Sequence, residues 1–234
     1  MTDIKILSAG AVQSMVSALG AEFERETGHK LNLNFNTVGS LRERLQAGEA
    51  ADLVILSASA IAALEKTGLF VPGSRTDLGR TVTGVVVKEG APLPDISTPA
   101  AFKQALLNAR SVAYSDPAAG GSSGTYFAGL LQQLDIAEAV NKKAVLGKRG
   151  YEVAQAVADG RAEIGTTFIS EALTVPGCKV VGPLPGELHN VNAYTAAIHV
   201  GSVVQDAARA LLRKLTNPAT AARWTAAGLE PAFS

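Results

Sequence analysis

The sequence is poor in the features that mark several common protein classes. Its 234 residues contain one cysteine, Cys178, which excludes an intrachain disulfide and a cysteine-based zinc cluster. Lysine and arginine number 21 together, as do aspartate and glutamate, so the chain lacks the net positive charge that nucleic-acid binding favours. No apolar run approaches the roughly 18 residues of a membrane-spanning helix. We therefore expect no nucleic-acid partner and no direct membrane insertion.

Motifs for metal and cofactor chemistry are also missing. The sequence has no HExxH zinc motif, no Walker loop, no GxGxxG fingerprint and no recognisable Ser-His-Asp arrangement. We therefore expect no metal and no cofactor, and we expect a monomer. Residues 1–7 enter a strand pattern directly, without the apolar core of a signal peptide. As it stands the sequence predicts a cytoplasmic protein, or a periplasmic one if a leader has been removed.

The first third of the chain alternates between strand and helix patterns. Each apolar strand run is followed by a helix with apolar residues at three- and four-residue spacing. This alternation predicts right-handed βαβ units and a mainly parallel sheet. The predicted strands are 4–9, 31–36 and 52–56, and the predicted helices are 12–27, 41–47 and 59–66.

A change of pattern near residue 80 indicates a second lobe. Residues 72–80 are polar and rich in turn formers, and a β-branched strand follows at 81–88. The predicted fold is α/β and two-lobed, each lobe a mainly parallel sheet flanked by helices, with a ligand cleft between the lobes. Lobe 1 is predicted to comprise 1–81 and 200–234, lobe 2 to comprise 82–199, and crossing strands to lie near 78–85 and 191–200.

The strongest candidate for a binding site is the stretch 114–127. A short strand leads into Asp116-Pro117, two glycines and three hydroxyl residues, and a helix pattern follows. Helix N-termini leave backbone N–H groups unpaired, and glycine lets the backbone approach a ligand closely. Such a junction suits an anion, although an Asx-turn with a serine N-cap has the same residue types. The candidate ligand residues are Ser122, Ser123, Gly124 and Thr125.

Other strand-to-helix turns supply further candidates. In open α/β sheets ligands gather at the carboxyl ends of the strands. The turns at 10–11 and 38–40 would offer mainly backbone N–H groups. The later turns would offer the guanidinium of Arg149, the phenol of Tyr151 and the strand end at 167–168. Ordinary turn geometry or solvent exposure accounts for each of them equally well. These candidates are Gly10, Ala11, Val38, Gly39, Ser40, Arg149, Tyr151, Thr167 and Phe168.

Several segments together resemble a known family. They are Phe23–Gly28, Leu45–Ile55, Ser115–Pro117, Val157–Gly165 and the closing 218–228 helix. With these segments the whole chain resembles the two-lobed periplasmic solute-binding proteins of type II, most closely the molybdate-binding branch. The resemblance implies a ligand held between helix N-termini and, for an exported protein, a membrane permease of an ABC transporter as partner.

The resemblance also implies hydroxyl groups that this sequence lacks. Molybdate-binding proteins present a serine where this chain has Ala11 and a tyrosine near Phe168. Because a buried oxyanion needs a donor for each oxygen, we expect a small organic carboxylate rather than molybdate or tungstate.

Two further segments, 169–177 and 181–188, are similar to aconitate isomerase, which is built on the same fold. That resemblance implies an alternative function, the cofactor-independent isomerisation of a small polycarboxylate. An isomerase requires a general base, and the candidates are Glu171, Tyr126, Lys148 and His189. The sequence reveals no partner for any of them, so no catalytic residue is assigned.

Overall fold

The computed structural model describes residues 2–234, which form two compact units. Unit 1 contains the chain up to Thr81 together with Asn192–Ser234, and unit 2 contains Val82–Val191. Both units are α/β, as the sequence predicts. Among the described residues no helix is both long and apolar enough to cross a membrane.

The sheet of unit 1 has a parallel centre. Strand β1 (Asp3–Ala9) lies between β2 (Lys30–Asn36) and β3 (Leu53–Ser57), and all three run in the same direction. Strand β9 (Val191–Ile198) is antiparallel to β3, and the short β10 (Glu230–Pro231) is antiparallel to the first part of β4 (Thr76–Lys88). All five side chains of β3 are buried, as expected of a strand covered on both faces.

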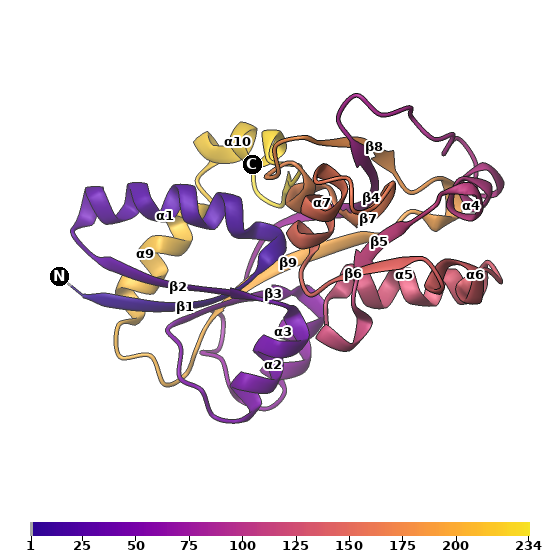
Figure 1. The fold of residues 1–234 in the computed structure, drawn as a ribbon. Coiled ribbons are helices and arrows are strands. Elements are labelled where there is room, and N and C mark those ends of the chain that lie inside the picture. The colour runs from indigo at the N-terminus through magenta and orange to yellow at the C-terminus, as the bar shows by residue number, and fades with distance from the viewer. Residues whose placement is uncertain (1) are drawn as a thin grey trace. The chain divides into compact units, whose positions relative to one another are not determined.

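Helices cover both faces of this sheet (Figure 1). Helix α1 (Gln13–Thr27) packs against α9 (Gln205–Leu215) on one side, and α2 (Val38–Gln46) and α3 (Ala58–Glu65) pack on the other. The apolar residues of α1 recur every three or four positions, and Gly28 ends the helix with a φ of 74°, a value that favours glycine.

The C-terminal part of unit 1 is anchored by its tryptophan. After a 3-10 turn (Pro218–Thr220), helix α10 (Ala221–Ala226) carries the fully buried Trp224. The indole N–H of Trp224 donates to the Leu215 carbonyl at 3.1 Å, and its ring meets Phe233 edge-on at 6.0 Å. A large buried ring with its polar atom satisfied is a stabilising contact.

Unit 2 has its own sheet with a parallel centre. Strand β5 (Val112–Ser115) lies between β6 (Ala144–Gly147) and β7 (Ile164–Phe168), and the three are parallel. The second part of β4 is antiparallel to β7 and to β8 (Cys178–Pro183).

Helices lie on both faces of the unit 2 sheet (Figure 1). One face holds α4 (Pro99–Asn108), α5 (Ser122–Gln133) and α6 (Ala137–Asn141), and its core includes Phe102 and Phe127. The other face holds α7 (Gly150–Ala158), whose Val153 and Val157 pack with Ala172 of α8 (Ile169–Ala172). Short 3-10 turns occupy Pro117–Ala119 and Gly186–Leu188.

Three predicted boundaries differ from the structure. Strand β4 already begins at Thr76, inside the segment predicted as turns, and its first part lies beside β9 and pairs with β10 at Gly79 and Arg80. Residues 192–199, predicted to lie in lobe 2, belong to unit 1 because β9 pairs with β3 along five residue pairs. Helix α5 starts at Ser122, so the candidate hydroxyl residues form its first turn instead of preceding it.

Candidate functional site

In unit 1 the candidate residues follow two neighbouring strands. Ala9 at the end of β1 pairs with Asn36 at the end of β2, which brings the two following turns to the same edge of the sheet. Gly10 and Ala11 belong to the 3-10 turn Gly10–Val12 that precedes α1. Val38, Gly39 and Ser40 form the first turn of α2.

Hydroxyl side chains cap two helices of unit 1. The Thr37 hydroxyl accepts from the Ser40 N–H at 3.2 Å at the start of α2. The Ser57 hydroxyl accepts from the Ala60 N–H at 3.3 Å at the start of α3. Each cap pairs an N–H group that would otherwise be available to a ligand. The Ser40 amide is therefore already engaged inside the protein.

In unit 2 three helices start at neighbouring strand ends. Ser115, the last residue of β5, pairs with Gly147, the last residue of β6, and Tyr114 pairs with Thr166 of β7. Helices α5, α7 and α8 follow these three strands in the chain. The N-termini of α5 and α7 therefore lie at one edge of the sheet, the carboxyl edge, where α/β proteins bind ligands.

The start of α5 fits tightly on the end of β5. The N-cap of α5 is Gly121, which has no side chain, and Ser123 and Gly124 are buried in the first turn. A Cβ added to Gly124 would lie 2.2 Å from the Ser115 carbonyl oxygen, so only glycine permits this approach. The Thr125 hydroxyl donates to the Gly121 carbonyl at 3.1 Å, and Ser122 is half-buried. The first turn of this helix therefore offers an anion backbone N–H groups and serine hydroxyls.

The start of α7 carries a fixed guanidinium. Arg149, the N-cap residue, donates from Nη2 to the Tyr151 hydroxyl at 2.7 Å and from Nε to Glu152 at 3.3 Å. Its guanidinium carbon lies 4.7 Å from the centre of the Tyr151 ring, a cation–π distance. These contacts hold the positive charge of Arg149 at the N-terminus of α7.

A buried carboxyl group faces the same helix start. Glu171 of α8 is buried, and a Cβ added to Gly150 would lie 2.0 Å from its Oε2. Burial raises the pKa of Glu171 to about 7. The Gly150 N–H, the charge of Arg149 and the Thr167 hydroxyl each lower this pKa and so oppose the effect of burial. The Thr167 hydroxyl lies close to this carboxylate but falls short of full hydrogen-bond geometry. Glu171 is thus a carboxyl group that can exchange a proton near neutral pH.

Four buried hydroxyls of unit 2 lie around these strand ends, on Ser115, Thr166, Thr167 and Ser170, and none of them exposes more than 2% of its surface. Within the described part of the chain their oxygen atoms make no hydrogen bond. Buried polar atoms normally have a partner, and each exception requires an explanation. Phe168, the last residue of β7, is buried and offers no hydroxyl.

The other candidate bases differ from Glu171 in their surroundings. The Tyr126 hydroxyl donates to the Leu188 carbonyl at 3.0 Å, and burial raises the pKa of Tyr126. Lys148 and His189 are exposed. Of the four residues, Glu171 alone combines burial with contact to a helix start.

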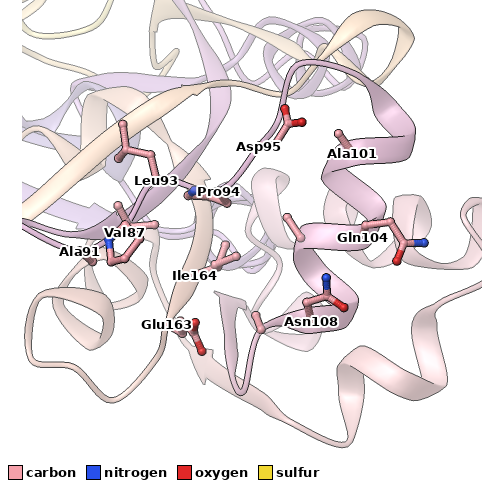
Figure 2. A pocket seen from close by; sticks show the side chains of 13 residues that line it. Val87, Ala91, Leu93, Pro94, Asp95, Ala101, Gln104, Asn108, Glu163 and Ile164 are labelled. Atoms are coloured by element: carbon pink, nitrogen blue, oxygen red, sulfur yellow. The ribbon is translucent and has the colours of Figure 1, made fainter.

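Unit 2 also contains a cavity of about 410 Å³ between α4 and the loop before it (Figure 2). Gln104 and Asn108 of α4 lie on one side, and Leu93 and Pro94 on the other. The cavity borders Ile164, the first residue of β7, and so lies at the opposite end of this strand from Phe168. Its charged lining residues are Asp95 and Glu163, both acidic, which does not suit an anion.

The fold defines a class of protein with two α/β units in which helices begin at the carboxyl ends of the strands. Residues 4–230 match the family described as bacterial extracellular solute-binding protein, so the chain belongs to this family. An aconitate isomerase of Pseudomonas sp is 34% identical, with coverage of 99% of this chain and 88% of that protein. A molybdate-binding protein ModA of Azotobacter vinelandii is 26% identical, with coverage of 92% and 85%.

Solved structures have the same fold. The periplasmic molybdate-binding protein of Azotobacter vinelandii matches with a TM-score of 0.75 at 19% identity, covering 97% of this chain and 98% of that one. At this identity the likeness shows the fold alone. The resemblances to the molybdate-binding branch and to aconitate isomerase are both confirmed.

The sequence does not reveal the contact between Gly150 and Glu171. The two residues are 21 positions apart and belong to different helices, so no local spacing joins them. The available signal is weak: an acidic residue lies three positions after Phe168, in a short helix that begins at a strand end.

Proposed function

We propose that this solute-binding protein takes a small organic polycarboxylate as its ligand, and that unit 2 binds one carboxylate at the start of α5. The observation that supports this most directly is the first turn of α5. Its N-cap has no side chain and Ser123 is buried beside it. The carbonyl of Ser115 lies against Gly124 of this turn, and the buried Ser115 hydroxyl is unpaired within the described residues. Backbone N–H groups and hydroxyls converging at a helix N-terminus suit a carboxylate.

The residues also favour a carboxylate over molybdate. Ala11 and Phe168 stand where the molybdate-binding branch has hydroxyl groups, and neither side chain can donate a hydrogen bond. Arg149 adds a positive charge at the second helix start of unit 2, and a guanidinium can bind a carboxylate through two parallel hydrogen bonds. The relative at 34% identity is named for the isomerisation of aconitate, a tricarboxylate.

A binding screen tests the ligand class. Isothermal titration with citrate, cis-aconitate, trans-aconitate, sulfate, molybdate and tungstate should give the highest affinity with a tricarboxylate. Micromolar binding of molybdate with no binding of the carboxylates would contradict the proposal.

A single substitution tests the place of binding. Ser123→Ala should weaken carboxylate binding by about 1–3 kcal/mol, because it removes a donor to a charged oxygen. Thr67→Ala is the matched control, since it removes an exposed hydroxyl just beyond α3 that donates to the Leu64 carbonyl. Equal affinities of the two variants would show that the Ser123 hydroxyl does not contact the ligand and has only a structural role.

The second candidate function is the isomerisation of such a ligand without a cofactor. Glu171 favours it, because a carboxyl with a pKa near 7 suits a group that removes and returns a proton at neutral pH. NMR in deuterated water should then show interconversion of cis- and trans-aconitate with deuterium entering the product. If the protein binds aconitate without interconversion or exchange, a transport role with a membrane permease as partner is favoured.

A further inference from the structure

We infer that Glu171 is the proton-exchanging group of the unit 2 site: its carboxyl gains a proton when an anion binds at the starts of α5 and α7, and loses it when the anion leaves. This inference rests on the proposed function, because it requires an anion at those helix starts.

Within unit 2, polar residues at the ends of β5 and β7 lie between the starts of α5 and α7. Tyr114 pairs with Thr166, so Ser115 and Thr167, the next residues of two parallel strands, lie side by side on one face. The backbone carbonyl of Ser115 lies against Gly124 in the first turn of α5, and the Thr167 hydroxyl lies against Gly150 at the start of α7, beside Glu171. Ser115 and Thr167 therefore lie between the start of α5 and Glu171.

Hydroxyls at these strand ends can adapt to either state of the Glu171 carboxyl. Ser115 and Thr167 are buried, and their oxygens have no hydrogen-bond partner among the described residues. A hydroxyl can donate to a carboxylate, or it can accept from a protonated carboxyl and donate elsewhere. When the Glu171 carboxyl gains or loses a proton, neighbouring hydroxyls can thus rotate to match it, without movement of the backbone.

Two anions at the N-terminus of α7 would compete electrostatically. The positive end of a helix and its unpaired N–H groups stabilise one negative charge there. The Glu171 carboxylate already receives the Gly150 N–H and the field of Arg149. A second anion nearby would repel this carboxylate and compete for the same positive groups, so protonation of Glu171 becomes more favourable.

Few other groups near Glu171 can take over this role. Helix α8 packs against α7, β7 and β8, and β7 carries no titratable residue. Glu152 forms an ion pair with Arg149, and burial raises the pKa of Cys178 to about 11, outside the neutral range. The titratable or charged residues on α7, β7 and β8 and at the N-cap of α7 are Arg149, Tyr151, Glu152, Cys178 and Lys179. Strand β4, whose Gly84 lies against Ile169 of α8, carries Asp77, Arg80 and Lys88.

Proton uptake can be measured by isothermal titration of the full chain with trans-aconitate. The heat is recorded in two buffers of different ionisation enthalpy at several pH values, which gives the number of protons bound with each anion. Wild type and a Glu163→Gln control should take up a fraction of a proton more than Glu171→Gln, with the largest difference between about pH 7 and 8. Any proton that trans-aconitate itself exchanges is the same for all three proteins and cancels.

The outcomes separate this inference from the proposed function. If trans-aconitate binds with equal proton uptake in wild type and Glu171→Gln, the inference is wrong while the binding function stands. If wild type binds none of the carboxylates, the proposed function fails and the inference falls with it.

A second measurement avoids dependence on the folding of the variant. With ¹³C-labelled glutamate, the side-chain carboxyl that titrates near neutral pH is followed by NMR in wild type. Its midpoint should move to higher pH on addition of trans-aconitate. A midpoint that is unchanged in a saturated sample overturns the inference.

Discussion

The starts of α2 and α3 in unit 1 are built differently from those of α5 and α7 in unit 2. In unit 1 the starts of α2 and α3 are closed by their own hydroxyl residues, Thr37 and Ser57. In unit 2 the N-caps of α5 and α7 are Gly121 and Arg149, and the Arg149 side chain turns to Glu152 and Tyr151. In unit 2, therefore, the first N–H groups of α5 and α7 receive no cap from the side chain of their own N-cap residue.

The comparison shows how strand–helix units of one type can serve different purposes. A side-chain cap satisfies an N–H group locally and stabilises the helix by about 1 kcal/mol. A helix start without such a cap forgoes this stabilisation but leaves positive potential for an anion. At the start of α7, a carboxyl group of the protein itself, that of Glu171, already occupies part of this positive potential.

The largest expected effect comes from disturbing the contact between α7 and Glu171. Gly150→Ala places a Cβ 2.0 Å from Glu171 Oε2 and 2.3 Å from Thr167 Oγ1, so the helix or the carboxyl must move. We expect a loss of about 3 kcal/mol in the free energy of unfolding, measured by urea denaturation. Gly129→Ala in α5 is the control, because no atom lies within 4 Å of the added Cβ. Its stability should rise slightly, and a similar loss in both variants would contradict the contact.

The next effect is a pH dependence of stability due to Glu171. Its pKa is raised from 4.5 to about 7 in the folded protein, so folding strengthens proton binding. The stabilisation is complete below the unfolded value and is lost as the pH rises through about 7. Between about pH 5 and 8 the free energy of unfolding of wild type should fall by on the order of 2–3 kcal/mol relative to Glu171→Gln.

A control carboxyl should behave with the opposite sign. The backbone and side chain of Arg110 lower the pKa of the partly exposed Glu163, so its contribution is lost on acidification and not at neutral pH. Urea denaturation of wild type, Glu171→Gln and Glu163→Gln across this range separates the two carboxyls. Parallel curves for wild type and Glu171→Gln would show that the Glu171 pKa is not raised.

A smaller effect is expected from a cap in unit 1. Ser57→Ala should lower stability by about 1 kcal/mol, because the Ala60 N–H in a buried position loses its acceptor. Carboxylate affinity should not change, since α3 carries none of the candidate ligand residues. A loss of affinity as large as that of Ser123→Ala would contradict the division between closed and open helix starts.

The smallest expected effect lies beside Ser123. The Thr125 hydroxyl donates back to the Gly121 carbonyl and is exposed, so Thr125→Ala should change stability by no more than about 0.5 kcal/mol. Its effect on titrations with trans-aconitate should be well below that of Ser123→Ala. The reverse order would assign the ligand contact to Thr125.

The sequence predicts the fold well where its signals are local. The alternation of apolar runs and helical patterns from 4 to 66 corresponds to β1 to α3 with shifts of a few residues. The prediction is weaker where pairing with a distant segment decides the structure. The first part of β4 lies beside β9 and pairs with Glu230 and Pro231, and 150 positions separate Arg80 from Glu230.

The candidate site is predicted in part for the same reason. Glycine and hydroxyl residues after strands indicate the starts of α5 and α2 from local composition alone. The adjacency of Ser115 and Thr167 depends on the register of β5 and β7, and that of Gly150 and Glu171 depends on the packing of α7 against α8. Neither adjacency has a local signature, so the sequence can name Glu171 as a possible base but cannot supply its surroundings.

The buried tryptophan of α10 makes the two units spectroscopically distinct. Trp224 is the single tryptophan of the chain and belongs to unit 1, whereas Tyr114, Tyr126 and Tyr151 belong to unit 2 and Tyr194 to unit 1. Selective excitation of tryptophan therefore reports the loss of packing around Phe233 and the Leu215 carbonyl, and so the unfolding of unit 1. When fluorescence and circular dichroism transitions are compared in the Gly150→Ala protein, a separation between them would show unit 2 unfolding before unit 1.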